Sequence, residues 1–157
     1  MAPPCAAILL VEDDPGHARL ITKNLQRAKV PNPIVWIDNG QLAVERLLSP
    51  RGSAPEPQPA LVLLDLNLPG LDGLQVLARI RGDRRTRNLP VAILTTSDQP
   101  AEIQRCQQLG CSGFLRKPIA NEQYADLVAN IRQILTTELI SIEIPEPAAD
   151  STRAERP

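Results

Sequence analysis

The most constraining feature of the sequence is a run of apolar residues that ends in a single aspartate. Residues 60–64 read Ala-Leu-Val-Leu-Leu, Asp65 follows, and a segment rich in turn residues extends to Gly73. A short apolar run bounded by turn residues is typical of a strand buried inside a parallel sheet. Open α/β sheets form their ligand crevices at the carboxyl ends of such strands. We therefore interpret Asp65 as a chemical group rather than a solubilising one.

A second acidic group follows another short apolar run. Residues 8–11 predict a buried strand that leads directly into Glu12, Asp13 and Asp14. Carboxylates gathered at one sheet edge repel each other, and a hard divalent cation such as magnesium relieves that repulsion. Acidic residues also favour helix N-termini, and this is the role that we prefer for Asp14. For Asp13, taken with Asp65, we predict a metal site.

Two further predicted strands end in polar residues. Residues 91–94 lead into Thr95, Thr96 and Ser97, and residues 113–116 lead into Lys117-Pro118. Because parallel strands share their carboxyl edge, two acidic groups, a hydroxyl and an ammonium are expected to converge there.

In order and spacing, these motifs resemble the receiver domain of two-component response regulators. The resemblance covers residues 6–136 and rests on Glu12-Asp13, Asp65 with Pro69 and Gly73 behind it, Thr95, and Lys117-Pro118. It implies a doubly wound, flavodoxin-like α/β fold with a parallel sheet in the order 2-1-3-4-5. It also implies that Asp65 accepts a phosphoryl group from a phosphohistidine on a sensor histidine kinase.

The same resemblance assigns roles to individual residues. Magnesium would be held by Glu12, Asp13, Asp65 and the main-chain carbonyl of Asn67. Thr95 and Phe114 would change conformation when Asp65 is phosphorylated, and Lys117 would bind the phosphoryl group. The resemblance also implies a cis peptide bond at Lys117-Pro118. Asn67, Thr96 and Ser97 would tune the lifetime of the phosphoryl group.

Elementary chemistry is consistent with these roles. The carboxylate of Asp65 is a nucleophile toward phosphorus and would form an acyl phosphate. Magnesium offsets the repulsion between this anion and the anionic phosphoryl group. Lys117 adds a compact positive charge, and the Thr95 hydroxyl can donate a hydrogen bond to a phosphoryl oxygen.

The remaining periodicity fits one domain. It predicts helices over 15–29, 41–48, from 72 onward and about 120–136, and a strand over 33–37. Residues 49–59 predict a loop. We assign the single His17 to a packed or capping role on the first of these helices.

Composition argues against several functions. Net charge is −1, and the four arginines of residues 81–88 lack interleaved aromatic residues, so we expect no nucleic-acid partner. We find neither a membrane-spanning run nor a signal peptide. Three cysteines without metal-ligand spacing, Cys5, Cys106 and Cys111, suit a reducing compartment, so we expect a cytoplasmic protein.

The C-terminal segment alternates apolar and polar residues. Ile140, Ile142 and Ile144 would share one side of a strand, so we predict a strand-like extension over 137–144. This segment either folds back on its own domain or pairs with the same segment of another subunit, and we favour the homodimer. Residues 1–5 are expected to form a tail, and residues 145–157 a disordered one. A receiver with this tail most resembles the small regulators paired with bacterial phytochromes, which implies a light-sensing kinase as donor.

Three classes of function remain open at this stage. The first is a phosphoacceptor switch without an effector domain, which would not count as an enzyme. The second is a phosphohydrolase with an aspartate nucleophile, which normally needs a second acid two residues later, where this chain has Asn67. The third is an interaction module that works without phosphorylation and would survive loss of Asp65.

Overall fold

The computed structural model describes residues 6–48, 58–96, 99–118 and 123–143, the last seven by their backbone alone. Strands and helices alternate along the chain: β1 (Ile8–Val11), α1 (Pro15–Arg27), β2 (Ile34–Ile37), α2 (Gly40–Leu47), β3 (Leu61–Asp65), α3 (Gly73–Gly82), β4 (Val91–Thr95), α4 (Pro100–Gln108), β5 (Gly113–Arg116) and α5 (Gln123–Glu143). The five strands form one parallel sheet in the order β2-β1-β3-β4-β5. The predicted fold class and strand order are confirmed.

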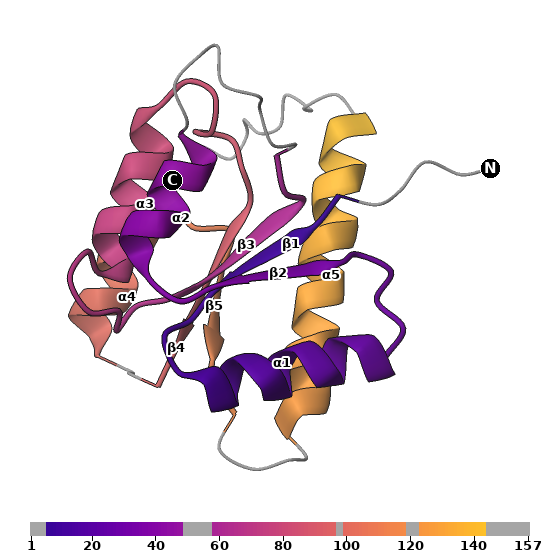
Figure 1. Cartoon of the computed structure of the whole chain (residues 1–157). Helices are drawn as coiled ribbons and strands as arrows, with labels where there is room; N and C mark the ends of the chain where they lie inside the picture. The colour runs from indigo at the N-terminus through magenta and orange to yellow at the C-terminus, as the bar shows by residue number, and fades with distance from the viewer. Residues whose placement is uncertain (1–5, 49–57, 97–98, 119–122, 144–157) are drawn as a thin grey trace.

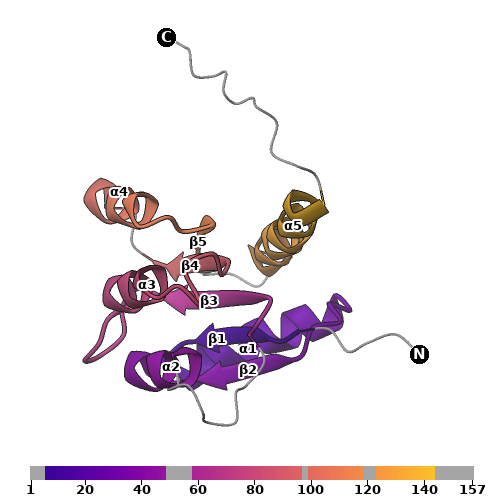
Figure 2. The same cartoon turned by 90° about the horizontal axis from the view of Figure 1, so that it is seen from above.

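Helices cover both faces of the sheet (Figures 1 and 2). Helices α2, α3 and α4 lie on one face, and α1 and α5 lie on the other. Side chains alternate between the two layers, as the period of a strand requires. On β1, for example, Leu9 and Val11 pack in the layer with α2 and α3, whereas Ile8 and Leu10 pack in the layer with α1 and α5.

The register of the sheet brings the polar strand ends together. Val11 pairs with Leu64, so the next residues, Glu12 and Asp65, leave adjacent strands at the same level. Asp65 in turn pairs with Leu94, immediately before Thr95. The site is therefore positioned by backbone pairing between strands that are fully buried.

The C-terminal prediction is wrong for the residues that the structure describes. Helix α5 continues through Glu143, so residues 137–143 are helical and do not form a strand. Leu135, Leu139 and Ile142 also fit a helical repeat, and extending an existing helix needs no new nucleus. Ile140 and Ile142 therefore lie on helical backbone. Ile144 and both predicted tails, 1–5 and 145–157, lie outside the described residues, as does most of the 49–59 loop.

Two further features of the described residues concern membrane-spanning helices and the arginine-rich segment. Within the described residues, no helix combines the length and apolarity needed to cross a bilayer. Two arginines of the 81–88 segment make intramolecular contacts: Arg81 donates to the carbonyls of Leu89 and Gly110, and Arg85 pairs with Asp83 at 3.0 Å. They stabilise the turn regions that follow α3 and α4.

Candidate phosphoryl and metal site

Three carboxylates meet at the carboxyl edge of the sheet. Glu12 and Asp13 follow β1, Asp65 ends β3, and one oxygen from each lies within 4.8 Å of the others. Glu12 and Asp65 are buried, and Asp13 is exposed at the mouth of the site. An all-oxygen donor set of three carboxylates, open on one side, suits a hard divalent cation such as Mg²⁺ or Mn²⁺.

Burial makes this cluster electrostatically unfavourable on its own. Burial raises the pKa of Glu12, and the negative charge of Asp65 raises it further, against the opposing effect of Lys117. A bound cation would relieve this repulsion, since it would supply positive charge to all three oxygens. The residues present therefore fit the metal that the sequence predicted.

Lys117 is the buried cation of the site. Its Nζ lies 2.7 Å from Oε1 of Glu12 and donates to Oδ2 of Asp65 at 3.0 Å. Burial alone would lower the pKa of Lys117, but the contacts with Glu12 and Asp65 raise it overall. The ammonium is thus charged and directed at the carboxylate that we predicted as the phosphoacceptor.

Backbone pairing places Lys117 at this edge. Its main-chain N–H donates to the carbonyl of Thr95 at 2.8 Å, which extends the pairing of β4 and β5 by one residue. The peptide bond to Pro118 is trans, so the predicted cis bond is wrong for this structure. The trans form is the lower in energy for Xaa-Pro by about 0.5–1 kcal/mol, and the pairing with Thr95 holds Lys117 in place with it.

The loop between β3 and α3 is shaped around Asp65. The N–H of Asn67 donates to Oδ1 of Asp65 at 3.0 Å, which orients the carboxylate. Asp72 caps α3 in a capping box with Gln75. A Cβ on Gly73 would lie 2.4 Å from the carbonyl oxygen of Asp65, so only glycine lets α3 begin this close to β3.

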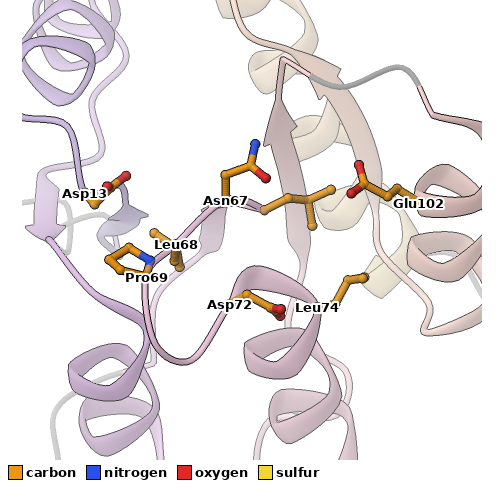
Figure 3. A pocket seen from close by; sticks show the side chains of 8 residues that line it. Asp13, Asn67, Leu68, Pro69, Asp72, Leu74 and Glu102 are labelled. Carbon is orange, nitrogen blue, oxygen red and sulfur yellow. The ribbon is translucent and has the colours of Figure 1, made fainter.

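The loop that follows β3 borders an open hollow (Figure 3). Asp13, Asn67, Pro69 and Asp72 line it together with Leu66, Leu68 and Leu74, and Glu102 of α4 lines its far side. Oε1 of Glu102 is buried without a hydrogen-bond partner among the described residues. No sequence pattern singles out Glu102, because it lies on a helix with no motif around it.

The remaining predicted site residues lie at or near this edge. Thr95 is fully buried at the end of β4, and Thr96 is exposed directly after it. Phe114, on β5, is partly buried against the layer of α2, α3 and α4. Ser97 lies outside the described residues. The roles of these residues in switching and tuning stay predictions, as does the metal contact of the Asn67 carbonyl.

His17 is a second residue at the site, besides Glu102, that the sequence reasoning missed. The role of Asp14 as a helix cap is confirmed, since its carboxylate accepts from the N–H groups of Gly16 and His17. His17, however, is not packed in the core: its side chain is 43% exposed, and Nδ1 lies 3.4 Å from Nζ of Lys117. The available signal was its position, one helical turn after a strand that ends in acidic residues.

Comparison with known proteins agrees with this geometry. Residues 8–139 match the family model for the response regulator receiver domain. The chain is 36% identical over 126 residues to "Probable methanogenesis regulatory protein FilR2" of Methanothrix harundinacea, covering 80% of this chain and 81% of that protein. It is 30% identical over 142 residues to "Response regulator Rcp1" of Synechocystis sp., covering 90% of this chain and 95% of Rcp1.

Solved structures of two regulators superimpose on most of the chain. The phosphorylated cyanobacterial phytochrome response regulator RcpA matches with a TM-score of 0.77 and 32% identity, over 85% of this chain and 96% of RcpA. The Mn²⁺-bound form of Rcp1 matches with a TM-score of 0.72 and 31% identity, over 80% of this chain and 91% of Rcp1. With the family match over residues 8–139, these similarities show that the chain belongs to the response regulator receiver domain family.

Proposed function

We propose that this chain is a phosphoacceptor switch that receives a phosphoryl group on Asp65 from a sensor histidine kinase. One observation carries the proposal: the ammonium of Lys117 contacts a buried aspartate that shares a three-carboxylate cluster. A structural ion pair needs one carboxylate, whereas phosphoryl transfer needs a nucleophile, a phosphate-binding cation and ligands for a metal. All three are present within one set of neighbouring side chains.

The chemistry follows from the positions of these groups. Oδ1 of Asp65 is held by the N–H of Asn67, and Oδ2 is held by Lys117. One of these oxygens would attack phosphorus as the bond to the donor nitrogen breaks, and Lys117 would then donate to a phosphoryl oxygen. The exposed position of Asp13 leaves the mouth of the site open to the donor.

Glu12, Asp13 and Asp65 would hold the divalent cation, with magnesium as the expected ion. When bound, it would screen the anionic nucleophile from the anionic phosphoryl group. The Thr95 hydroxyl, at the adjacent strand end, would donate to the phosphoryl oxygens once they are in place.

Intact mass spectrometry after incubation with acetyl phosphate tests this function. Wild type should gain one phosphoryl group only when magnesium is present, and Asp65→Asn should gain none. Asp38→Asn is the matched control, because Asp38 follows β2 at the same sheet edge and is exposed. An unmodified, folded, metal-bound wild type would refute the proposal and favour an interaction module that works without phosphorylation.

For the donor, we propose a kinase of the phytochrome class. Similarity to a phytochrome response regulator supports this choice, whereas the similarity to FilR2 points to a different pathway. Phosphoryl transfer from a phosphorylated phytochrome kinase should be at least about 100-fold faster than from an unrelated kinase, equivalent to about 2.8 kcal/mol of discrimination. Equal rates from both kinases would contradict the pairing.

The homodimer stays a prediction, but the helical C-terminal segment requires a different dimer contact from the strand pairing predicted from the sequence. Strand pairing through Ile140 and Ile142 does not apply to a helical segment. Dimerisation would then use a face of α5. Sedimentation of the full chain and of a chain truncated after Thr137 tests this: an unchanged monomer in both would exclude the dimer.

A further inference from the structure

Lys117 has a third neighbour besides the two buried carboxylates. Nδ1 of His17 lies 3.4 Å from its Nζ, within hydrogen-bonding distance, although the two residues are 100 positions apart in the chain. An ammonium group has three N–H donors and no acceptor. Lys117 therefore donates to Asp65, has Nδ1 of His17 within hydrogen-bonding distance, and forms an ion pair with Glu12 at 2.7 Å.

The distances favour an acceptor role for this ring nitrogen. Nδ1 lies 3.9 Å from Oε2 of Glu12 and 3.8 Å from Oδ2 of Asp14, both beyond hydrogen-bonding distance. Lys117 is the nearer polar group, and it can only donate. A ring nitrogen that accepts from Lys117 carries no hydrogen, so this contact requires the tautomer with its ring hydrogen on Nε2.

The N-terminus of α1 fixes the position of His17. Asp14 accepts from the main-chain N–H of Gly16 at 2.8 Å and of His17 at 3.3 Å, and Pro15 occupies the first turn. The backbone of His17 is thus held by the cap, one turn from the end of β1. A capped first turn limits the directions that the imidazole can take.

We propose that His17 is a positioning residue for the phosphate-binding Lys117. The inference rests on the proposed function and extends it. When a phosphoryl group arrives on Asp65, the N–H of Lys117 that faces Asp65 must turn to a phosphoryl oxygen. Glu12 and His17 then hold Nζ in place while that single donor is redirected, so the ammonium does not have to be repositioned during transfer.

The first test observes Lys117 directly, in the metal-free protein. The chain has only three lysines, Lys23, Lys29 and Lys117, and the first two are exposed. Nitrogen-15 NMR of the ammonium groups should show slow hydrogen exchange for Lys117 alone. In His17→Ala this exchange should be at least about 3-fold faster, whereas His17→Asn should retain slow exchange, because Oδ1 of Asn can occupy the place of Nδ1.

The second test measures phosphorylation by acetyl phosphate at saturating magnesium. His17→Ala should lower the maximal rate about 3- to 10-fold, up to about 1.4 kcal/mol in activation free energy, with an unchanged half-saturating concentration of acetyl phosphate. His17→Asn should lie within about 2-fold of wild type. Gln26→Ala, an exposed neutral position on the same helix, is the control and should not differ from wild type.

The outcomes separate this inference from the proposed function. If His17→Ala matches wild type in both tests, or if His17→Asn is as impaired as His17→Ala, the positioning role is wrong while the phosphoacceptor function stands. If wild type accepts no phosphoryl group, the proposed function fails. The NMR comparison then still decides whether His17 holds Lys117.

Discussion

Replacing Glu12 by glutamine should stabilise the metal-free protein. The side chain of Glu12 is fully buried, attracted by Lys117 at 2.7 Å and repelled by two carboxylates within 4.8 Å. At an effective dielectric constant of about 20, the attraction is about 6 kcal/mol and the repulsion by the buried Asp65 is at least about 3.5 kcal/mol, whereas solvent screens the exposed Asp13. The repulsion cancels much of the attraction, so the cost of burying the charge decides the sign, in agreement with the raised pKa of Glu12.

The sign of the stability change follows from the linkage between proton binding and folding. A carboxyl whose pKa is raised on folding stabilises the fold below its unfolded pKa, about 4.3, and this contribution is lost as pH rises through the folded value. At neutral pH the ionised Glu12 therefore carries a net cost that glutamine lacks, while the amide oxygen still accepts from Lys117. We expect Glu12→Gln to gain about 1–2 kcal/mol without metal, or about 3–6 °C in Tm for a chain of this size.

Thermal unfolding in the presence of a chelator, and then with magnesium, measures the effect. At a magnesium concentration 100-fold above Kd, wild type should gain about 2.7 kcal/mol, and Glu12→Gln should gain less because it has lost a ligand. Glu45→Gln, an exposed carboxylate on α2, controls for the change in net charge. The reasoning is refuted if Glu12→Gln is less stable than wild type in chelator, or if its advantage persists at about pH 4.

Three further predictions concern the surroundings of the site. Gly73→Ala should destabilise the fold by about 1–3 kcal/mol in chemical unfolding, because its Cβ would meet backbone atoms at 2.4 and 2.6 Å. Gly82→Ala, which enters open space on the same helix, should not destabilise it, and equal losses would contradict the close-approach argument. Trp36, the only tryptophan, donates from Nε1 to the Glu12 carbonyl at 2.7 Å, so its fluorescence should change as a divalent cation binds. A calorimetric signal for cation binding without a change in fluorescence would show that Trp36 is not coupled to the metal site. Burial, reinforced by the neighbouring Cys111 and Glu102, raises the pKa of Cys106 to about 11, so the native thiol should resist alkylation at pH 8 and ionise only near pH 11. Because this pKa is raised on folding, the free energy of unfolding should fall as pH rises from about 8.5 through 11. Rapid labelling of Cys106 in the folded protein at pH 8 would argue against burial of its thiol.

Local sequence patterns were sufficient to predict strands and site residues wherever a short apolar run was bounded by turn or polar residues. Each fully buried strand is a short apolar run, and Asp65 stands out because a charge directly after such a run needs a chemical or structural reason. The helix-capping role of Asp14 could likewise be predicted locally, since Asp14 directly precedes a proline at the first position of α1. The strand order was not contained in these local signals; it came from the resemblance of the motifs to a known family.

The sequence failed where the same pattern suits two conformations. Residues 139–144 alternate as a strand does, yet Leu135, Leu139 and Ile142 also recur as in a helix. A strand would need a partner edge, whereas α5 was already nucleated and packed against the sheet through residues such as Ile131. Continuation of the helix therefore prevailed over local alternation.

The sequence alone determined which side chains can do chemistry and at which ends of strands they lie. Only the tertiary structure decided how these groups are partnered. Lys117 meets Glu12, Asp65 and His17 because parallel pairing of β1, β3, β4 and β5 and the cap of α1 bring distant segments to one edge. Such contacts depend on register and helix orientation across about 100 residues, and no local pattern encodes them.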